Sequence, residues 1–133
     1  IAFVERDNTS AAVAALAPAT KLLGEGISIL VAPEGTRVEG AGVGEFKKGA
    51  FRMAMAAKVP IVPIVIRNVE DIGSRSSGTM RPGTVDVAVL PPIDVGSWTK
   101  RDLDRRIAAV RGLFVEMLEN WPRHVAAGRK TRR

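Results

Sequence analysis

The sequence predicts an α/β domain with a mainly parallel central sheet flanked by helices. Short apolar runs alternate along the chain with segments whose apolar residues recur every three or four positions, the order typical of strands alternating with helices. The length of 133 residues, 46% of them apolar and 26% charged, suits one globular domain. The longest nearly apolar run covers residues 59–66. A membrane-spanning helix needs about 18 such residues, so any membrane contact of this segment is expected to be peripheral.

The first part of the chain predicts a strand, a helix and a second strand. Residues 1–5 have the composition of a strand end, and any of residues 8–10 can cap a helix over residues 11 to about 24. Pro18 is expected to interrupt or restart that helix. Residues 27–32 are apolar except for one serine and lie between a glycine and a proline, which is typical of a strand buried on both faces of a parallel sheet.

The middle of the chain predicts a short helix over residues 49–58 and a third strand over residues 61–66. Pro63 would delete a ladder hydrogen bond, so we expect it at a sheet edge, a bulge or a strand end. The helical spacing places three side chains of the short helix inward, namely Phe51, Ala54 and Met55.

The last elements are a fourth strand over residues 85–89, where valines alternate with Asp and Ala, and a long helix. Thr99 and Asp102 form a capping-box-like start for this helix. Its opposite face mixes acids and arginines, including Arg111, so its apolar stripe is expected to pack in the core rather than on lipid. The stripe consists of Leu103, Ile107, Val110, Phe114, Met117, Leu118 and Trp121.

The charge of the chain divides it into residues 1–122 and a basic tail, residues 123–133. The net charge is +6 and there is no cysteine, which excludes disulfides and thiol chemistry. Most of the excess charge lies in the tail, which we expect to be a disordered end rather than a nucleic-acid or lipid contact. The chain has few aromatic residues and no cluster that could stack bases, which argues against nucleic-acid binding.

The segment most typical of a binding site is residues 33–37, Pro-Glu-Gly-Thr-Arg, directly after the second predicted strand. Loops at the carboxyl ends of parallel strands bind ligands in α/β sheets. Arg37 offers a planar fork for two phosphate oxygens, and Gly35 lets a ligand approach the backbone. A tight turn closed by an ion pair between Glu34 and Arg37 explains the same residues equally well.

Two lysines favour the anion site. Lys47 and Lys48 directly precede the predicted helix, whose first amides carry partial positive charge. Together with Arg37 they would form a phosphate cradle. The simpler alternative is that both side chains extend into water.

Other catalytic motifs are not found. The glycines of residues 40–44 miss the spacing of a dinucleotide fingerprint and of a P-loop. The single histidine, His124, adjoins the basic tail, and no metal-ligand spacing occurs. The sequence therefore indicates an anion pocket without a catalytic base and without a metal.

Three blocks in order resemble the lysophosphatidic acid acyltransferase family, the glycerolipid acyltransferases that make phosphatidic acid. Residues 3–8 (FVERDN) are similar to the family's second block, and residues 31–37 (VAPEGTR) are similar to its third, with Ala32 in place of the usual Phe. Residues 59–64 (VPIVPI) are similar to its fourth block. Residues 46–49 and 82–87 also follow the family's pattern.

The resemblance implies a glycerol-3-phosphate-acyltransferase-like fold and a set of substrate-binding residues. Arg6 and Arg37 would contact the acceptor phosphate, and Pro63 would help to form the acyl-donor side. Glu34, Gly35 and Thr36 would shape the glycerol-phosphate site. The complete set of expected binding residues is Arg6, Glu34, Gly35, Thr36, Arg37, Lys47, Lys48 and Pro63.

The family's first block, His-x4-Asp, is missing from this sequence. In the family it supplies the base that takes the proton of the acceptor hydroxyl, which then attacks an acyl thioester. We expect it upstream of Ile1, which makes the chain the N-terminally truncated, substrate-binding part of an acyltransferase with little activity of its own.

The expected reaction uses acyl-CoA or acyl carrier protein as donor and lysophosphatidate as acceptor, with no further cofactor. The expected location is the cytoplasmic face of the cell membrane, with peripheral contact or an anchor outside these residues. The alternative from another class is a non-catalytic module that binds phosphate or lipid head groups.

Overall fold

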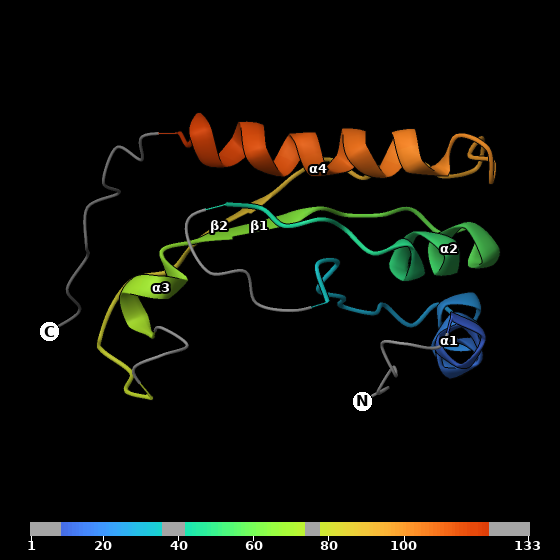
Figure 1. Cartoon of the computed structure of the whole chain (residues 1–133), viewed down its shortest axis with the longest axis horizontal. Coiled ribbons are helices and arrows are strands. Elements are labelled where there is room, and N and C mark those ends of the chain that lie inside the picture. Colours follow the sequence, from blue (N-terminus) through green and yellow to red (C-terminus); the bar gives the residue numbers. More distant parts are fainter. Residues whose placement is uncertain (1–8, 36–41, 74–77, 123–133) are drawn as a thin grey trace, which may run out of the picture.

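The computed structural model describes residues 9–35, 42–73 and 78–122, and these ranges form a small α/β assembly (Figure 1). A two-stranded sheet lies beside the longest helix, and two further helices pack together at one end (Figure 1). The elements in chain order are α1 (Thr9–Gly24), α2 (Lys48–Ala57), β1 (Ile64–Arg67), α3 (Val69–Ile72), β2 (Asp86–Val89) and α4 (Leu103–Glu119).

The described strands pair in an antiparallel ladder. Ile64 is opposite Val89, and Arg67 is opposite Asp86. The Arg67 Nε also donates a hydrogen bond of 2.8 Å to the Asp86 carboxylate at the end of the ladder. This ladder differs from the mainly parallel sheet that the sequence predicts. A parallel pair usually has a helix packed on the sheet as its crossover, whereas the described part of the connection between β1 and β2 contains only the four-residue α3.

Pro63 lies buried directly before β1, so its expected place at a strand end is confirmed. Since proline has no N–H, the third predicted strand divides at this position. An isolated bridge joins Ile61 to Ile93, and the continuous ladder begins only at Ile64. The Pro63 carbonyl accepts a hydrogen bond of 2.9 Å from the Leu90 amide, which keeps the proline beside the end of β2.

The prediction of a strand over residues 27–32 is wrong for the described structure. This segment has no strand assignment, and Leu30 is 86% exposed. Its apolar composition suits a strand covered on both faces, but a strand also needs a neighbouring backbone for its ladder. Among the described residues, β1 and β2 pair only with each other.

The first predicted helix forms as α1 and continues through Pro18. The expected interruption does not occur, because a proline removes one hydrogen bond of the helix without necessarily ending it. Thr20, two residues later, donates its hydroxyl to the Leu16 carbonyl at 3.0 Å, within the turn that contains the proline. The described structure contains no helix long and apolar enough to span a bilayer.

The core lies between α2 and α4, as the helical spacing predicts. Phe51 and Ala54 of α2 are buried, and Met55 packs against them in part. From α4 and its flank come Leu103, Ile107, Val110 and, at the far end, Trp121. The core position of the α4 stripe is therefore confirmed for Leu103, Ile107 and Val110 and in part for Phe114, whereas Met117 and Leu118 are half-buried and lie outside the core cluster.

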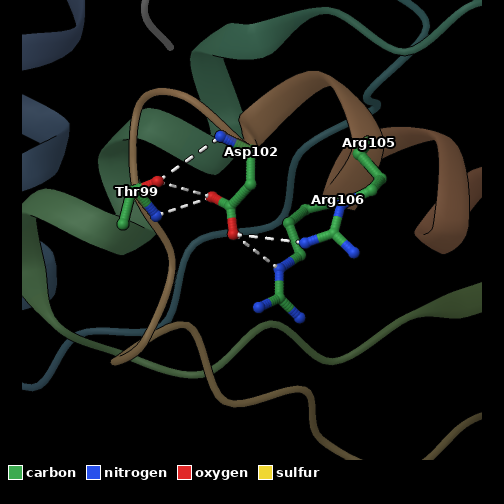
Figure 2. Close-up of polar contacts among 4 residues, drawn as sticks. All are labelled: Thr99, Asp102, Arg105 and Arg106. Carbon is green, nitrogen blue, oxygen red and sulfur yellow. Dashed lines mark hydrogen bonds and ion pairs between the residues drawn. The ribbon is translucent and has the colours of Figure 1, made fainter.

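The start of α4 is closed by the predicted capping box (Figure 2). The Thr99 amide and hydroxyl donate to the Asp102 carboxylate at 2.8 and 3.0 Å, and the Asp102 amide lies 3.4 Å from the Thr99 hydroxyl. Arg106 adds a hydrogen bond of 3.2 Å to the same carboxylate. These reciprocal bonds close the turn that leads into the first residue of α4, Leu103.

Candidate functional site

The centre of the candidate site is a tight turn over residues 32–35. The Gly35 amide donates to the Ala32 carbonyl at 3.2 Å, and Pro33 stands at the second position, where its fixed φ is favourable. Gly35 has φ +69°, in the left-handed region that disfavours other residues. The backbone therefore forms the tight turn that the sequence offered as an alternative to a ligand site. This turn does not exclude a ligand beside it.

Two hydrogen bonds hold this turn against the segment that leads into α2. The Gly44 amide donates to Oε2 of Glu34 at 2.7 Å. The Lys47 amide donates to the Pro33 carbonyl, also at 2.7 Å. Residues that are ten and fourteen positions apart in the sequence therefore form one compact unit, with the acidic side chain of the turn facing the glycine-rich segment.

Lys47 lies beside the turn. It is the N-cap residue of α2, and a Cβ placed on Gly35 would lie 3.5 Å from its Cγ. The first turn of α2 carries no acidic residue and the N-cap contributes no side-chain hydrogen bond. An exposed cation, the positive end of a helix and the flexible backbone of Gly35 thus meet at one place.

Lys48 is oriented differently. It is the first residue of α2, and its Nζ lies 2.6 Å from Oδ1 of Asp104 on α4. Both side chains are largely exposed, at 48% and 75%, so the pair contributes little to stability. The expectation that both lysines lie free for an anion therefore fits Lys47 better than Lys48.

Helix α4 supports the segment from the other side. Arg111 donates from Nε to the Gly44 carbonyl at 2.9 Å and from Nη2 to the Val43 carbonyl. Phe114, one turn further along, packs edge-on against Phe46 with ring centroids 5.1 Å apart. The segment between the turn and α2 is thus fixed by polar and apolar contacts from one helix.

Arg111 was expected on the solvated face of the last helix and was not among the predicted site residues. Arg111 is half-buried and bound to backbone. The only available signal was its spacing, since it lies three residues before Phe114 and four after Ile107, positions that share a helix face.

Several predicted residues lie outside the described residues, namely Arg6, Thr36, Arg37, His124, the strand over residues 1–5 and the tail. The expected ion pair between Glu34 and Arg37 lies there too. The structure brings Glu34, Gly35 and Lys47 together, while Pro63 belongs to the sheet.

In the described part of the chain, no group of side chains forms a recognisable centre for acid–base or metal chemistry. No group of three or more His, Cys, Asp or Glu residues that could hold a metal occurs there. The pKa of Asp102 is lowered, chiefly by the hydrogen bond from the Thr99 amide. Since Asp102 caps α4, this shift reflects a structural role.

Comparisons with known proteins define the class of this chain. The sequence model of the family described as Acyltransferase matches residues 1–67. The chain is 35% identical over 113 residues to 1-acyl-sn-glycerol-3-phosphate acyltransferase alpha of Mus musculus, covering 84% of the chain and 40% of that relative. It is 37% identical over 100 residues to the 1-acyl-sn-glycerol-3-phosphate acyltransferase of Salmonella typhimurium, and this match covers 75% of the chain and 40% of that relative.

A solved structure agrees with the sequence relatives. The crystal structure of the 1-acyl-sn-glycerophosphate (LPA) acyltransferase PlsC from Thermotoga maritima superposes with a TM-score of 0.68 at 31% identity, over 81% of this chain and 45% of that one. The chain belongs to the acyltransferase family, and the α/β glycerolipid acyltransferase fold is confirmed. It spans about two fifths of the length of the curated relatives.

Proposed function

We propose that this chain forms the acceptor-binding part of an enzyme that transfers an acyl group to the free hydroxyl of lysophosphatidate, giving phosphatidate. The observation that carries the proposal is the pair of hydrogen bonds from Gly44 to Glu34 and from Lys47 to Pro33. They place the start of α2 beside the turn that leads directly into Thr36 and Arg37. The names of the relatives, all 1-acyl-sn-glycerol-3-phosphate acyltransferases, support the same acceptor.

The acceptor phosphate is recognised by charge and by geometry. Arg37 and Arg6 supply planar forks that match two phosphate oxygens each, and Lys47 supplies a point charge beside the turn. Each charge-assisted hydrogen bond contributes about 1.5–3 kcal/mol. Lys48 contributes less to this attraction, because its ammonium is paired with the carboxylate of Asp104.

The chemical step needs a base that this chain does not contain. In the proposed enzyme a His-x4-Asp block upstream of Ile1 takes the proton of the acceptor hydroxyl. The hydroxyl oxygen then attacks the thioester carbonyl of acyl-CoA or acyl carrier protein, and the carbon–sulfur bond breaks. We expect the 133 residues alone to form little or no product.

The proposed reaction takes place at a membrane, because the acceptor lysophosphatidate and the product phosphatidate both reside there. We propose peripheral contact at the cytoplasmic face, where Pro63 belongs to the acyl-donor side of the site. No metal or further cofactor takes part in the proposed reaction, and nucleic acid is not a partner.

Arg37→Lys tests the proposal in the complete protein that carries this chain. Lysine keeps the charge but loses the two-pronged geometry, so the KM for lysophosphatidate should rise about tenfold, equivalent to about 1.4 kcal/mol. Thioester-dependent formation of phosphatidate is followed at varied acceptor concentration, with the exposed Arg101→Lys as the matched control. An unchanged acceptor KM and kcat would remove Arg37 from the site.

One observation favours a second candidate, a non-catalytic module that binds phosphate or lipid head groups. The described residues contain no histidine, since His124 is the only one in the sequence. Binding of lysophosphatidate without any product, by the complete protein, would favour this module over the enzyme.

A further inference from the structure

Arg111, a half-buried residue of α4, binds backbone carbonyls of a distant segment. Its guanidinium donates to two successive backbone carbonyls, Gly44 through Nε at 2.9 Å and Val43 through Nη2. The bonds join positions 67 and 68 residues apart. A planar guanidinium can hold two neighbouring carbonyls at once, which a lysine ammonium at the same position cannot do with comparable geometry.

The peptide unit between Val43 and Gly44 connects Arg111 with Glu34. Its carbonyl accepts from Arg111, and its N–H donates to Oε2 of Glu34 at 2.7 Å. A trans peptide is planar, with its C=O and N–H pointing to opposite sides. Fixing the carbonyl therefore fixes the direction of the N–H, and a cation on the oxygen polarises the N–H into a stronger donor.

We infer that Arg111 is a positioning residue for the acceptor site and acts on Glu34 through this single peptide. The inference rests on the proposed function, together with the role in shaping the glycerol-phosphate site that the family resemblance implies for Glu34. The half-buried Glu34 immediately precedes Gly35, whose backbone lies beside Lys47. The orientation of Glu34 and that of the turn are thereby determined from α4.

The segment stays docked without this contact, because Phe46 is buried in the core and packs on Phe114. Loss of the guanidinium should therefore change the orientation of the peptide between Val43 and Gly44, while the chain still folds. That distinction separates a positioning role from a structural one.

The first test is spectroscopic and uses the 133-residue chain. Arg111→Met and Glu34→Ala should each shift the amide proton resonance of Gly44 upfield, as expected for a weakened hydrogen bond. Arg105→Met is the matched control, because Arg105 is an exposed arginine of α4 that pairs with Asp102. A Gly44 resonance that stays unchanged in folded Arg111→Met would overturn the inference.

The second test is kinetic and uses the complete protein. Arg111→Met should raise the KM for lysophosphatidate about tenfold and leave the KM for the acyl thioester unchanged. In a Glu34→Ala background the same substitution should add almost nothing, since residues that act through one contact are not additive. Equal rises in both KM values, or full additivity, would contradict the positioning role.

Two further results have a defined meaning: a variant that does not fold, and a complete protein that forms no product. If Arg111→Met does not fold, Arg111→Lys replaces it, and a folded lysine variant with wild-type Gly44 resonance and acceptor KM overturns the inference. If the unsubstituted complete protein forms no phosphatidate, the proposed function fails, and the Gly44 resonance alone still decides whether Arg111 orients the peptide.

Discussion

At the scale of single residues, the backbone of Gly35 determines the shape of the candidate site. Its φ of +69° lets the chain turn sharply between Glu34 and the residues that follow. A side chain at this position would meet the Lys47 Cγ at an ordinary contact distance of 3.5 Å, so backbone strain is the main obstacle. The glycine therefore serves the turn first and ligand access second.

Gly35→Ala should lower the free energy of unfolding by roughly 1–2 kcal/mol, because alanine disfavours the left-handed region. Urea unfolding of the 133-residue chain measures the change. Gly42→Ala is the matched control, since no described residue lies within 4 Å of a Cβ placed on Gly42 and its φ is not positive. Equal stability of the two variants would show that the turn relaxes without strain.

At the same scale, the sequence predicted which residues lie close together better than it predicted their contacts, and the binding roles of these residues stay predictions. Glu34, Gly35 and Lys47 come together as expected. The sequence suggested Arg37 as the partner of Glu34, whereas the partner observed among the described residues is the backbone amide of Gly44, which no side-chain pattern could have indicated. Lys48 and its contact with Asp104 depend on how α2 and α4 pack, which the spacing within one helix does not specify.

At the scale of elements, the start of α4 depends on the ionised carboxylate of Asp102. Hydrogen bonds from the Thr99 amide and hydroxyl and from Arg106 hold its pKa below the ordinary value (Figure 2). A lowered pKa in the folded state stabilises the fold above the ordinary pKa of about 3.9. That contribution is lost as the pH falls through the lowered folded-state pKa.

Asp102→Asn should therefore be less stable than the unsubstituted chain at pH 7, with a difference that shrinks as the pH falls below about 4. Urea unfolding between pH 7 and pH 2.5 provides the comparison. Asp71→Asn, at an exposed position of α3, serves as the control. A difference that stays constant over the whole pH range would mean that the charge of Asp102 plays no part in capping.

Elements whose signals are local were predicted well. The capping box and the apolar stripe of α4 involve neighbours within one or two turns; the capping box is confirmed, and so is the first half of the stripe. The strand over residues 27–32 was predicted wrongly because its composition reports burial but not the presence of a pairing partner. The orientation of β1 and β2 also depends on a connection whose path the periodicity does not determine.

At the scale of the whole molecule, α4 is the helix that connects the core with the candidate site. It packs on α2 and β1, it provides much of the core, and through Arg111 and Phe114 it holds the segment between the candidate turn and α2 (Figure 1). The last helix of the described structure thus supports a site formed by residues 32–47, in the first half of the chain. Agreement with the LPA acyltransferase structure over 81% of the chain places this arrangement in a shared fold.

The central claim is that this chain provides a phosphate-binding acceptor site. The preference between acceptors with and without a phosphate tests this claim most directly. The measurement is kcat/KM of the complete protein for lysophosphatidate and for the corresponding monoacylglycerol, with the same acyl thioester. Since a phosphate would engage at least two charge-assisted contacts of about 1.5–3 kcal/mol each, lysophosphatidate should be preferred by a factor on the order of 100 or more. Equal values for the two acceptors, or no transfer to either, would contradict the account.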